Sequence, residues 1–164
     1  MATGSVSALD QDTYQLVATN TTTSGSTSTF SSLSGYKKYI LTFEGVTLST
    51  NANAVLTFNS STSNYYGRAA LWGENTYSGP AGTGIPLNYT TYINSMNGLY
   101  VIDNITNGAP RTVKGIYNTG NSAGTTPITI DGGWLDTSAI TSMVVTLSTG
   151  TFSAGSMKLY GIAG

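Results

Sequence analysis

The sequence predicts an all-β fold: a single-domain antiparallel β-sandwich of eight or nine strands, jelly-roll-like in its arrangement. Glycine and asparagine recur at short intervals along the 164 residues, which indicates frequent turns. The segments between them are rich in β-branched and aromatic residues. No stretch of about 11 residues keeps a helical periodicity. Many short strands with glycine-rich turns are typical of sandwiches and barrels.

The strands are expected at intervals of roughly 10 to 20 residues. Within 39–48 the apolar positions switch parity after Gly45, which indicates a β-bulge. Leu99 and Val101 alternate with Tyr100 and Ile102, so their strand is expected to be covered on both sides. The expected strands are 14–18, 39–48, 54–58, 99–102, 113–117, 128–130, 143–147 and 157–162.

The remaining segments are interpreted as arm, loop and turn. Residues 1–11 are expected to form an N-terminal arm and residues 12–164 the sandwich domain. The Ser/Thr-rich segment 19–28 is expected to be a hairpin loop or a linker. Asp136 is expected to cap one short turn before the strand that begins at Met143.

Composition separates this chain from most functional classes. Ser, Thr, Asn and Gly make up about half of it, and charged residues only 8%, against about 25% in an ordinary domain. The apolar content is that of a folded protein, so disorder is not expected. A net charge of −1 supplies no cationic surface for a phosphate backbone, so no nucleic-acid partner is expected.

Two missing residue types limit the chemistry. There is no Cys and no His, which excludes disulfides, thiolate metal sites and Ser-His or Cys-His nucleophiles. We expect no metal and no other cofactor. No apolar run approaches the roughly 20 residues that span a bilayer, so no membrane partner is expected. The first ten residues lack the basic and apolar parts of a secretory signal, which predicts synthesis in a cytoplasm.

Carboxylates leave one enzymatic alternative to consider. A glycan-cleaving enzyme needs two carboxyl groups a few ångströms apart, and Glu44, Glu74 and Asp103 are the candidates. Glu44, beside the expected bulge, is instead expected to face solvent or to pair with Lys37 or Lys38. We therefore expect no enzymatic activity.

Aromatic residues gather in the most turn-rich third of the chain. Tyrosine and tryptophan combine a large apolar face with a polar tip, which suits both protein interfaces and sugar-stacking sites. Two interpretations stay open for this set: core or subunit interface, and exposed ligand platform. The candidates are Tyr65, Tyr66, Trp72, Tyr77, Tyr89 and Tyr92.

The C-terminal third carries a resemblance. It reads, in order, Gly133-Trp134, Asp136-Thr-Ser-Ala-Ile140-Thr-Ser, Val145-x-Leu147, Phe152-Ser-Ala-Gly155 and Leu159-Tyr160-Gly161-Ile162. This order resembles the ending of small β-sandwich proteins and modules on tailed bacteriophage particles. Residues 30–39 and 58–65 resemble the same modules more loosely, so the likeness spans most of 14–164 and is dense only after Gly133.

The matching residues are expected to serve folding. Phe152 and Gly155 are expected to flank a hairpin turn, and Gly161 to let a neighbouring backbone or ring approach the last strand. Trp134 is expected to plug the core. The match therefore bears on the fold and on a virion context, and it identifies no binding site.

The resemblance implies a non-enzymatic homo-oligomer, most often a trimer, on the virion exterior. Such relatives serve as capsid decoration or cement proteins and as tail-fibre tips. About ten residues precede the first expected strand, which favours decoration over the end of a long fibre. The leading hypothesis is a decoration protein whose arm, with Val6, Leu9 and Asp10, docks on the major capsid protein. The alternative is a tail-fibre or baseplate module that recognises host-surface glycans.

Overall fold

The computed structural model describes residues 14–71, 77–78, 82–88, 94–103, 105–106, 108–121 and 124–163. Their regular secondary structure consists of β-strands, and none of them belongs to a helix long and apolar enough to cross a membrane. The strands are β1 (Tyr14–Thr21), β2 (Thr27–Phe30), β3 (Tyr36–Leu48), β4 (Ala54–Phe58), β5 (Tyr65–Leu71), β6 (Tyr77–Ser78), β7 (Ile85–Pro86), β8 (Ser95–Asp103), β9 (Arg111–Asn121), β10 (Gly124–Trp134), β11 (Met143–Leu147) and β12 (Phe152–Ala163).

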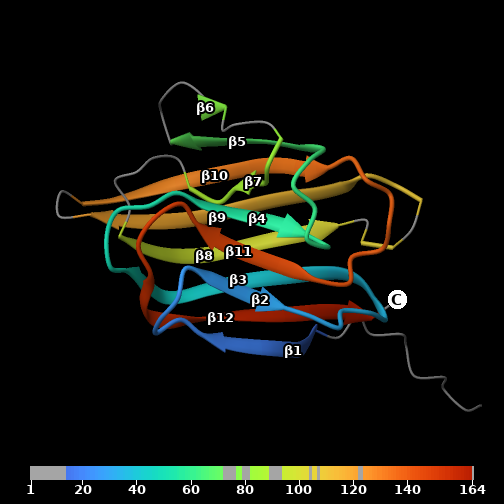
Figure 1. The fold of residues 1–164 in the computed structure, drawn as a ribbon, viewed down its shortest axis with the longest axis horizontal. Helices are drawn as coiled ribbons and strands as arrows, with labels where there is room; N and C mark the ends of the chain where they lie inside the picture. The colour runs from blue at the N-terminus through green and yellow to red at the C-terminus, as the bar shows by residue number, and fades with distance from the viewer. Residues whose placement is uncertain are drawn as a thin grey trace, which may run out of the picture.

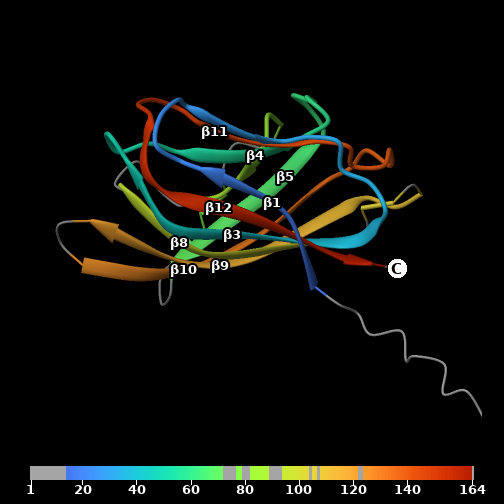
Figure 2. The same cartoon turned by 90° about the horizontal axis from the view of Figure 1, so that it is seen from below.

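The strands form two antiparallel sheets that pack face to face (Figures 1 and 2). The large sheet has the order β1-β12-β3-β8-β9-β10-β5-β6, and the small sheet the order β2-β11-β4-β7. The strands pair from the two ends of the chain inward: the first strand, β1, pairs with the last, β12, and the second, β2, pairs with β11. This nesting is the arrangement of a jelly roll, and β9, β10, β5 and β6 extend its large sheet.

The predicted fold class is confirmed, but the predicted count of eight or nine strands is too low. Twelve strands are described, and the sequence pattern missed β2, β5, β6 and β7. The segment 19–28 is not a hairpin loop, because its two ends belong to β1 and β2, which lie in different sheets. Its polar residues connect the two layers.

The core lies between the sheets, where alternate residues of each strand are buried. β11 and β4 show this pattern without interruption, as buried and half-buried residues alternate along both. Trp134 is 2% exposed and packs against the rings of Phe58 and Tyr65, with centroids 5.7 and 5.9 Å from its own. The expectation that Trp134 plugs the core is confirmed.

The bulge expected at Gly45 is present. The register between β3 and β8 shifts between Phe43 and Val46, and Gly45 has a φ of +59°. On the neighbouring strand Gly155 has a φ of +89°, and a Cβ there would come within 2.3 Å of the Gly45 carbonyl oxygen. The two glycines therefore let β3 and β12 bulge against each other.

This position corrects one expectation. Phe152 and Gly155 do not flank a hairpin turn, because both lie inside β12. The turn comes earlier, at 148–151, and it joins β11 of the small sheet to β12 of the large one. The expectation that Gly161 lets a ring approach the last strand is confirmed. A Cβ added to Gly161 would lie 2.3 Å from the nearest carbon of the Tyr36 ring.

Candidate functional site

Two consecutive tyrosines of the predicted aromatic site face in opposite directions. Tyr65 is 3% exposed and belongs to the core. Its hydroxyl oxygen accepts a hydrogen bond from the Phe58 backbone N–H at 2.7 Å and donates to the Phe58 carbonyl at 3.2 Å. Burial raises the pKa of Tyr65, so the hydroxyl stays protonated. Tyr65 is therefore a core residue, as the first of the two interpretations has it.

Tyr66 is the exposed member of the pair. Its side chain is on the outward face of the large sheet, and its hydroxyl end lies over Gly133 of β10. A Cβ added to Gly133 would lie 2.6 Å from the Tyr66 hydroxyl oxygen. Two residues further along β5, Arg68 lies opposite Asp131 of β10. Trp72, Tyr89 and Tyr92 lie outside the described residues, as does the side chain of Tyr77.

The candidate arm also lies outside the part of the chain that the structure describes. This holds for Val6, Leu9 and Asp10, and for the boundary between residues 11 and 12. Arm and docking therefore remain predictions.

The candidate carboxylates are held by lysines. Glu44 is exposed, as one of the two expectations had it, and its Oε2 accepts a hydrogen bond from Lys158 Nζ at 2.6 Å, across β3 and β12. Asp103 pairs with Lys38 at 2.9 Å. The bond to Glu44 raises the pKa of Lys158. Glu74 lies outside the described residues, and those residues hold no group of three or more acidic side chains that could bind a metal.

The outward face of the large sheet carries exposed apolar side chains on neighbouring strands. Leu99 is 45% exposed and lies opposite Ile116, which is 63% exposed. The expectation that this strand is covered on both sides is therefore wrong: Tyr100 and Ile102 face the core, while Leu99 faces outward.

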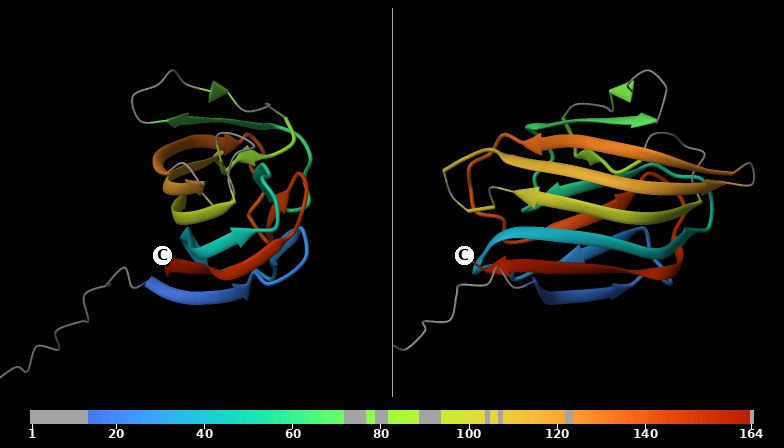
Figure 3. Two further views of the ribbon diagram at one scale, coloured as in Figure 1. Left: turned by 90° about the vertical axis from the view of Figure 1, so that its left-hand side faces the viewer. Right: turned by 180° about the vertical axis from the view of Figure 1, so that it is seen from behind.

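The apolar residues continue in a row across the sheet. The partners run from Leu16 on β1 to Tyr160, Ile40 and Val101 on β12, β3 and β8. Leu16 is 57% exposed and the other three are half-buried. We call this set the outer-face patch: Leu16, Ile40, Leu99, Val101, Ile116 and Tyr160. The right-hand view of Figure 3 looks onto the large sheet that carries it.

A shallow groove of about 390 Å³ runs along this patch. Leu99, Val101 and Ile116 supply its apolar part, and Lys114 and Asp131 stand opposite each other on β9 and β10 at its side. An apolar centre with charges of both signs at the margin is the composition of a protein interface.

Two loops at one end of the sandwich are tied to a buried arginine. The Arg111 guanidinium is fully buried and donates hydrogen bonds to the carbonyls of Ala109 and Ser138. Burial lowers the pKa of Arg111, and the charge of Asp136 opposes this shift. Arg111 thereby links the loop before β9 to the segment that follows β10.

Asp136 closes a local turn in that segment. Its Oδ1 accepts a hydrogen bond from the Ser138 backbone N–H at 2.7 Å. The bonds from the Ser138 hydroxyl and N–H, and then the Arg111 charge, hold the pKa of Asp136 below its usual range. The expected cap is present as an Asx turn, without a helical turn after it.

Comparisons with protein-family models, curated proteins and solved structures found no match. The functional interpretation of the site therefore rests on its own chemistry: the outward-facing ring of Tyr66, paired surface charges, and the outer-face patch.

Sequence reasoning missed the outer-face patch. Its signal was present in the alternation of the β8 segment, where apolar residues occupy both parities. That pattern was interpreted as a strand covered on both sides within one chain. The same pattern is satisfied when the second cover comes from another chain.

Proposed function

We propose that the protein is a structural component of a bacteriophage virion, a capsid decoration or cement protein that covers the head exterior as a homo-oligomer. The observation that carries the proposal is the outer-face patch. Leu99 and Ile116 expose apolar surface in the middle of the large sheet, where burial by another copy removes that surface from water.

The surface charges support the same proposal. Lys158 with Glu44 and Lys38 with Asp103 are already paired within one chain. A second copy that packs on the neighbouring patch meets charges that are largely neutralised, which lowers the cost of desolvation. The protein then acts mechanically: copies that pack on one another and on the shell add buried area across the capsid surface.

The resemblance in the C-terminal third gives the virion context. Its residues form the end of β10, the following turn, β11 and β12, which are the strands that close the jelly roll. Arm docking remains part of the proposal, with residues 1–11 contacting the major capsid protein and the patch contacting other copies.

Location on the particle is the first test. Virions of the phage that encodes this chain are purified, their proteins identified by mass spectrometry, and the heads imaged by cryo-electron microscopy. We expect many copies on the outer surface of the head. Absence from the particle would refute the virion role.

Self-association is the second test. Leu99→Lys and Ile116→Lys add a charge to the patch at exposed positions, so the fold is retained. We expect light scattering to show oligomers for the natural protein and for Thr29→Lys, a control on the outward face of the small sheet. The two patch variants should be monomers, and equal masses for all four proteins would exclude the patch as the contact. Deletion of residues 1–11 should leave the oligomer and abolish decoration.

The alternative, a tail-fibre or baseplate module that binds host-surface glycans, is favoured by Tyr66. Its ring end rests on Gly133 and its side chain is 41% exposed beside Arg68 and Asp131, as a sugar-stacking ring would be. Tyr66→Ala should then abolish adsorption of the phage to its host while the particle remains intact. Unchanged adsorption would remove this alternative.

A further inference from the structure

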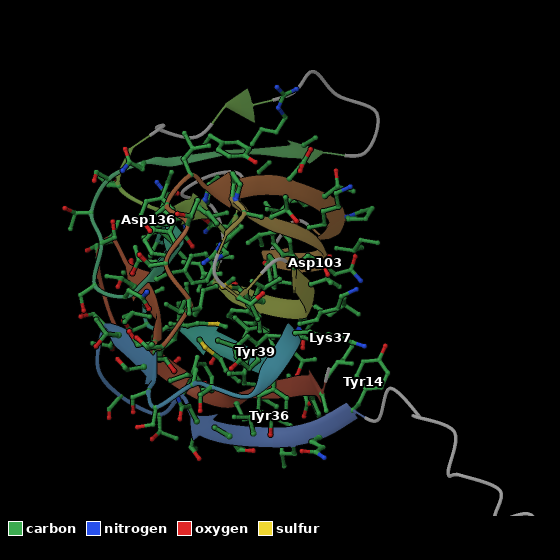
Figure 4. All side chains as sticks on the ribbon, turned by 90° about the vertical axis from the view of Figure 1, so that its right-hand side faces the viewer. Tyr14, Tyr36, Lys37, Tyr39, Asp103 and Asp136 are labelled. Atoms are coloured by element: carbon green, nitrogen blue, oxygen red, sulfur yellow. The ribbon has the colours of Figure 1, made fainter. Side chains whose placement is uncertain are left out.

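The outer-face patch runs obliquely across five strands of the large sheet, with Ile40 of β3 at its centre. One end is Ile116 on β9, two strands from Ile40. At the other end, also two strands away, Tyr14 continues the patch beside Leu16, and Figure 4 looks onto the end of the sandwich where Tyr14 begins β1. Tyr14 and Ile116 lie two residues to opposite sides of the row that contains Ile40. The patch is therefore nearly symmetric about Ile40.

Two ion pairs flank the patch on opposite sides. Lys158 with Glu44 lies on one side, and Lys38 with Asp103 on the other. Lys158 and Asp103 are each one strand from Ile40, on β12 and β8, and each is two residues from its row, in opposite directions. With strands about 4.8 Å apart and a rise of about 3.3 Å per residue, the line from Lys158 to Asp103 crosses the patch almost at a right angle.

The patch is large enough for a stable contact with a second copy. Of the six large apolar side chains that are exposed among the described residues, Tyr14, Leu16, Leu99 and Ile116 lie on it. β1 has eight residues and β8 has nine, so the outward face of the five strands measures roughly 25 by 30 Å, or about 700 Å². A standard interface buries about 800 Å² on each partner. One contact with the same face of a second copy therefore covers the whole patch.

The flanking charges select how the second copy is oriented. Two two-fold axes in the plane of the contact superimpose one patch on the other: one runs across the patch and one runs along it. The axis across the patch places Lys158 against Lys158 of the second copy, and Asp103 against Asp103. The axis along the patch places Lys158 against Asp103 of the second copy, and facing sheets about 10 Å apart leave a gap that these two side chains can span. Only the axis along the patch brings opposite charges together.

We propose that two copies pack face to face through the outer-face patch, about a two-fold axis along it, with Lys158 of each copy paired to Asp103 of the other. This geometry rests on the patch contact of the proposed function and adds its symmetry and its charge pairs. The charges then alternate in sign from Lys38 and Asp103 of one copy to Lys158 and Glu44 of the other. Because a two-fold contact uses the same surface on both copies, the dimer is closed and leaves the small sheet uncovered.

The test uses two charge-reversal variants of the full chain, alone and mixed. Lys158→Glu places carboxylates against each other across the contact, and Asp103→Lys places ammonium groups against each other. Each variant alone should therefore self-associate at least about tenfold more weakly than the natural protein. In an equimolar mixture every contact joins opposite charges again, so sedimentation velocity should show dimers with one copy of each variant. Undiminished association of either variant alone, or no association in the mixture, would overturn the proposal.

Asp131→Lys is the matched control. Asp131 also lies on the outward face beside opposite charges, because its partners across the sheet are Lys114 and Arg68. It is on β10, one strand beyond the end of the patch. Its reversal should change the association constant by about twofold or less. Circular dichroism confirms that all three variants are folded, so that a loss of association reports on the contact.

Single cysteines measure the axis independently, because the chain contains no cysteine. With the axis along the patch, Tyr14 and Ile116 each face the same residue of the second copy. A short bismaleimide should then link Tyr14→Cys to itself and Ile116→Cys to itself. With the axis across the patch, Tyr14 faces Ile116 of the second copy, and only a mixture of the two variants would be linked. That second result would overturn the proposed axis.

Failure of this geometry differs from failure of the proposed function. If Leu99→Lys dissociates the natural oligomer while Lys158→Glu does not, the patch contact stands and the two-fold axis is wrong. If the natural protein sediments as a monomer, the patch contact and the axis are both wrong. The virion role is decided separately, by the presence of the protein on the particle.

Discussion

The ring of Tyr100 on β8 occupies the space where Gly115 of β9 would otherwise carry a side chain. A Cβ at Gly115 would come within 2.3 Å of the Tyr100 ring, and the Tyr100 hydroxyl donates to the Leu87 carbonyl at 2.8 Å. The glycine thus lets a long, buried side chain cross the sandwich and reach a loop on the other side. Burial raises the pKa of Tyr100 well above its usual value.

Gly115→Ala should destabilise the protein by about 1–3 kcal/mol, because the added methyl group overpacks the space filled by Tyr100. Urea denaturation followed by circular dichroism measures the effect. Asn118→Ala, at an exposed position on the same strand, should change stability by about 0.5 kcal/mol or less. Equal effects of the two changes would show that the ring moves aside without cost.

Asn59 should be the most sensitive residue in the turn after β4. It has a φ of +51°, its Oδ1 accepts hydrogen bonds from the Thr141 and Ser142 N–H groups, and its Nδ2 donates to the Ala139 carbonyl. We expect Asn59→Ala to cost about 2–4 kcal/mol, through lost bonds and through strain in the left-handed conformation.

Asn59→Gly separates these two causes. Glycine adopts a positive φ freely but cannot make the side-chain bonds, so it should cost less than alanine by about 1 kcal/mol. Thermal unfolding of the three proteins gives the comparison. If glycine and alanine cost the same, backbone strain contributes nothing at this position.

Arg111→Met should destabilise the protein by about 1–3 kcal/mol, because the carbonyls of Ala109 and Ser138 lose their donors while the long apolar stem is replaced. Hydrogen exchange should accelerate most at Gly108 and Ile140, whose amides bond within the same two loops. Arg111→Lys retains the charge but offers fewer donors, and an intermediate loss is expected. An unchanged exchange rate at both amides would contradict this role.

Asp136 should make stability depend on pH in the acid range. Its pKa is lower in the folded protein than in the unfolded chain, so its contribution is complete above the ordinary value near 3.8 and is lost as the pH falls through the folded value. Asp136→Asn keeps an oxygen that accepts the Ser138 N–H but does not titrate. The difference in unfolding temperature between the two proteins should therefore shrink from pH 6 to about pH 2. A constant difference in unfolding temperature over this range would show that titration of Asp136 does not affect stability.

The fold class and most strands followed from the sequence because apolar alternation was clear in them. β2 was hidden because its outward residues Thr27 and Thr29 continue a Ser/Thr-rich run, while Ser28 and Phe30 face the core. β5 was hidden among turn-forming residues, with Gly67 inside it. β6 and β7 have two residues each, too few to form a pattern.

The candidate site was less accessible to sequence reasoning. Tyr65 and Tyr66 are adjacent, and only knowledge of the strand tells that one faces the core and the other solvent. The partner of Glu44 was missed because Lys158 comes from a strand 114 positions later in the chain. Cross-strand register, which no local pattern contains, determines both the charge pairs and the outer-face patch.

The position of β12 between β1 and β3 has a consequence for how the protein is made. β1 and β3 are synthesised long before β12, so the large sheet lacks the strand between them until β12 has been made. Such distant pairing makes folding slow, because a long loop must close before any bond repays the lost entropy. Conditions that slow aggregation during expression should therefore raise the yield of folded protein.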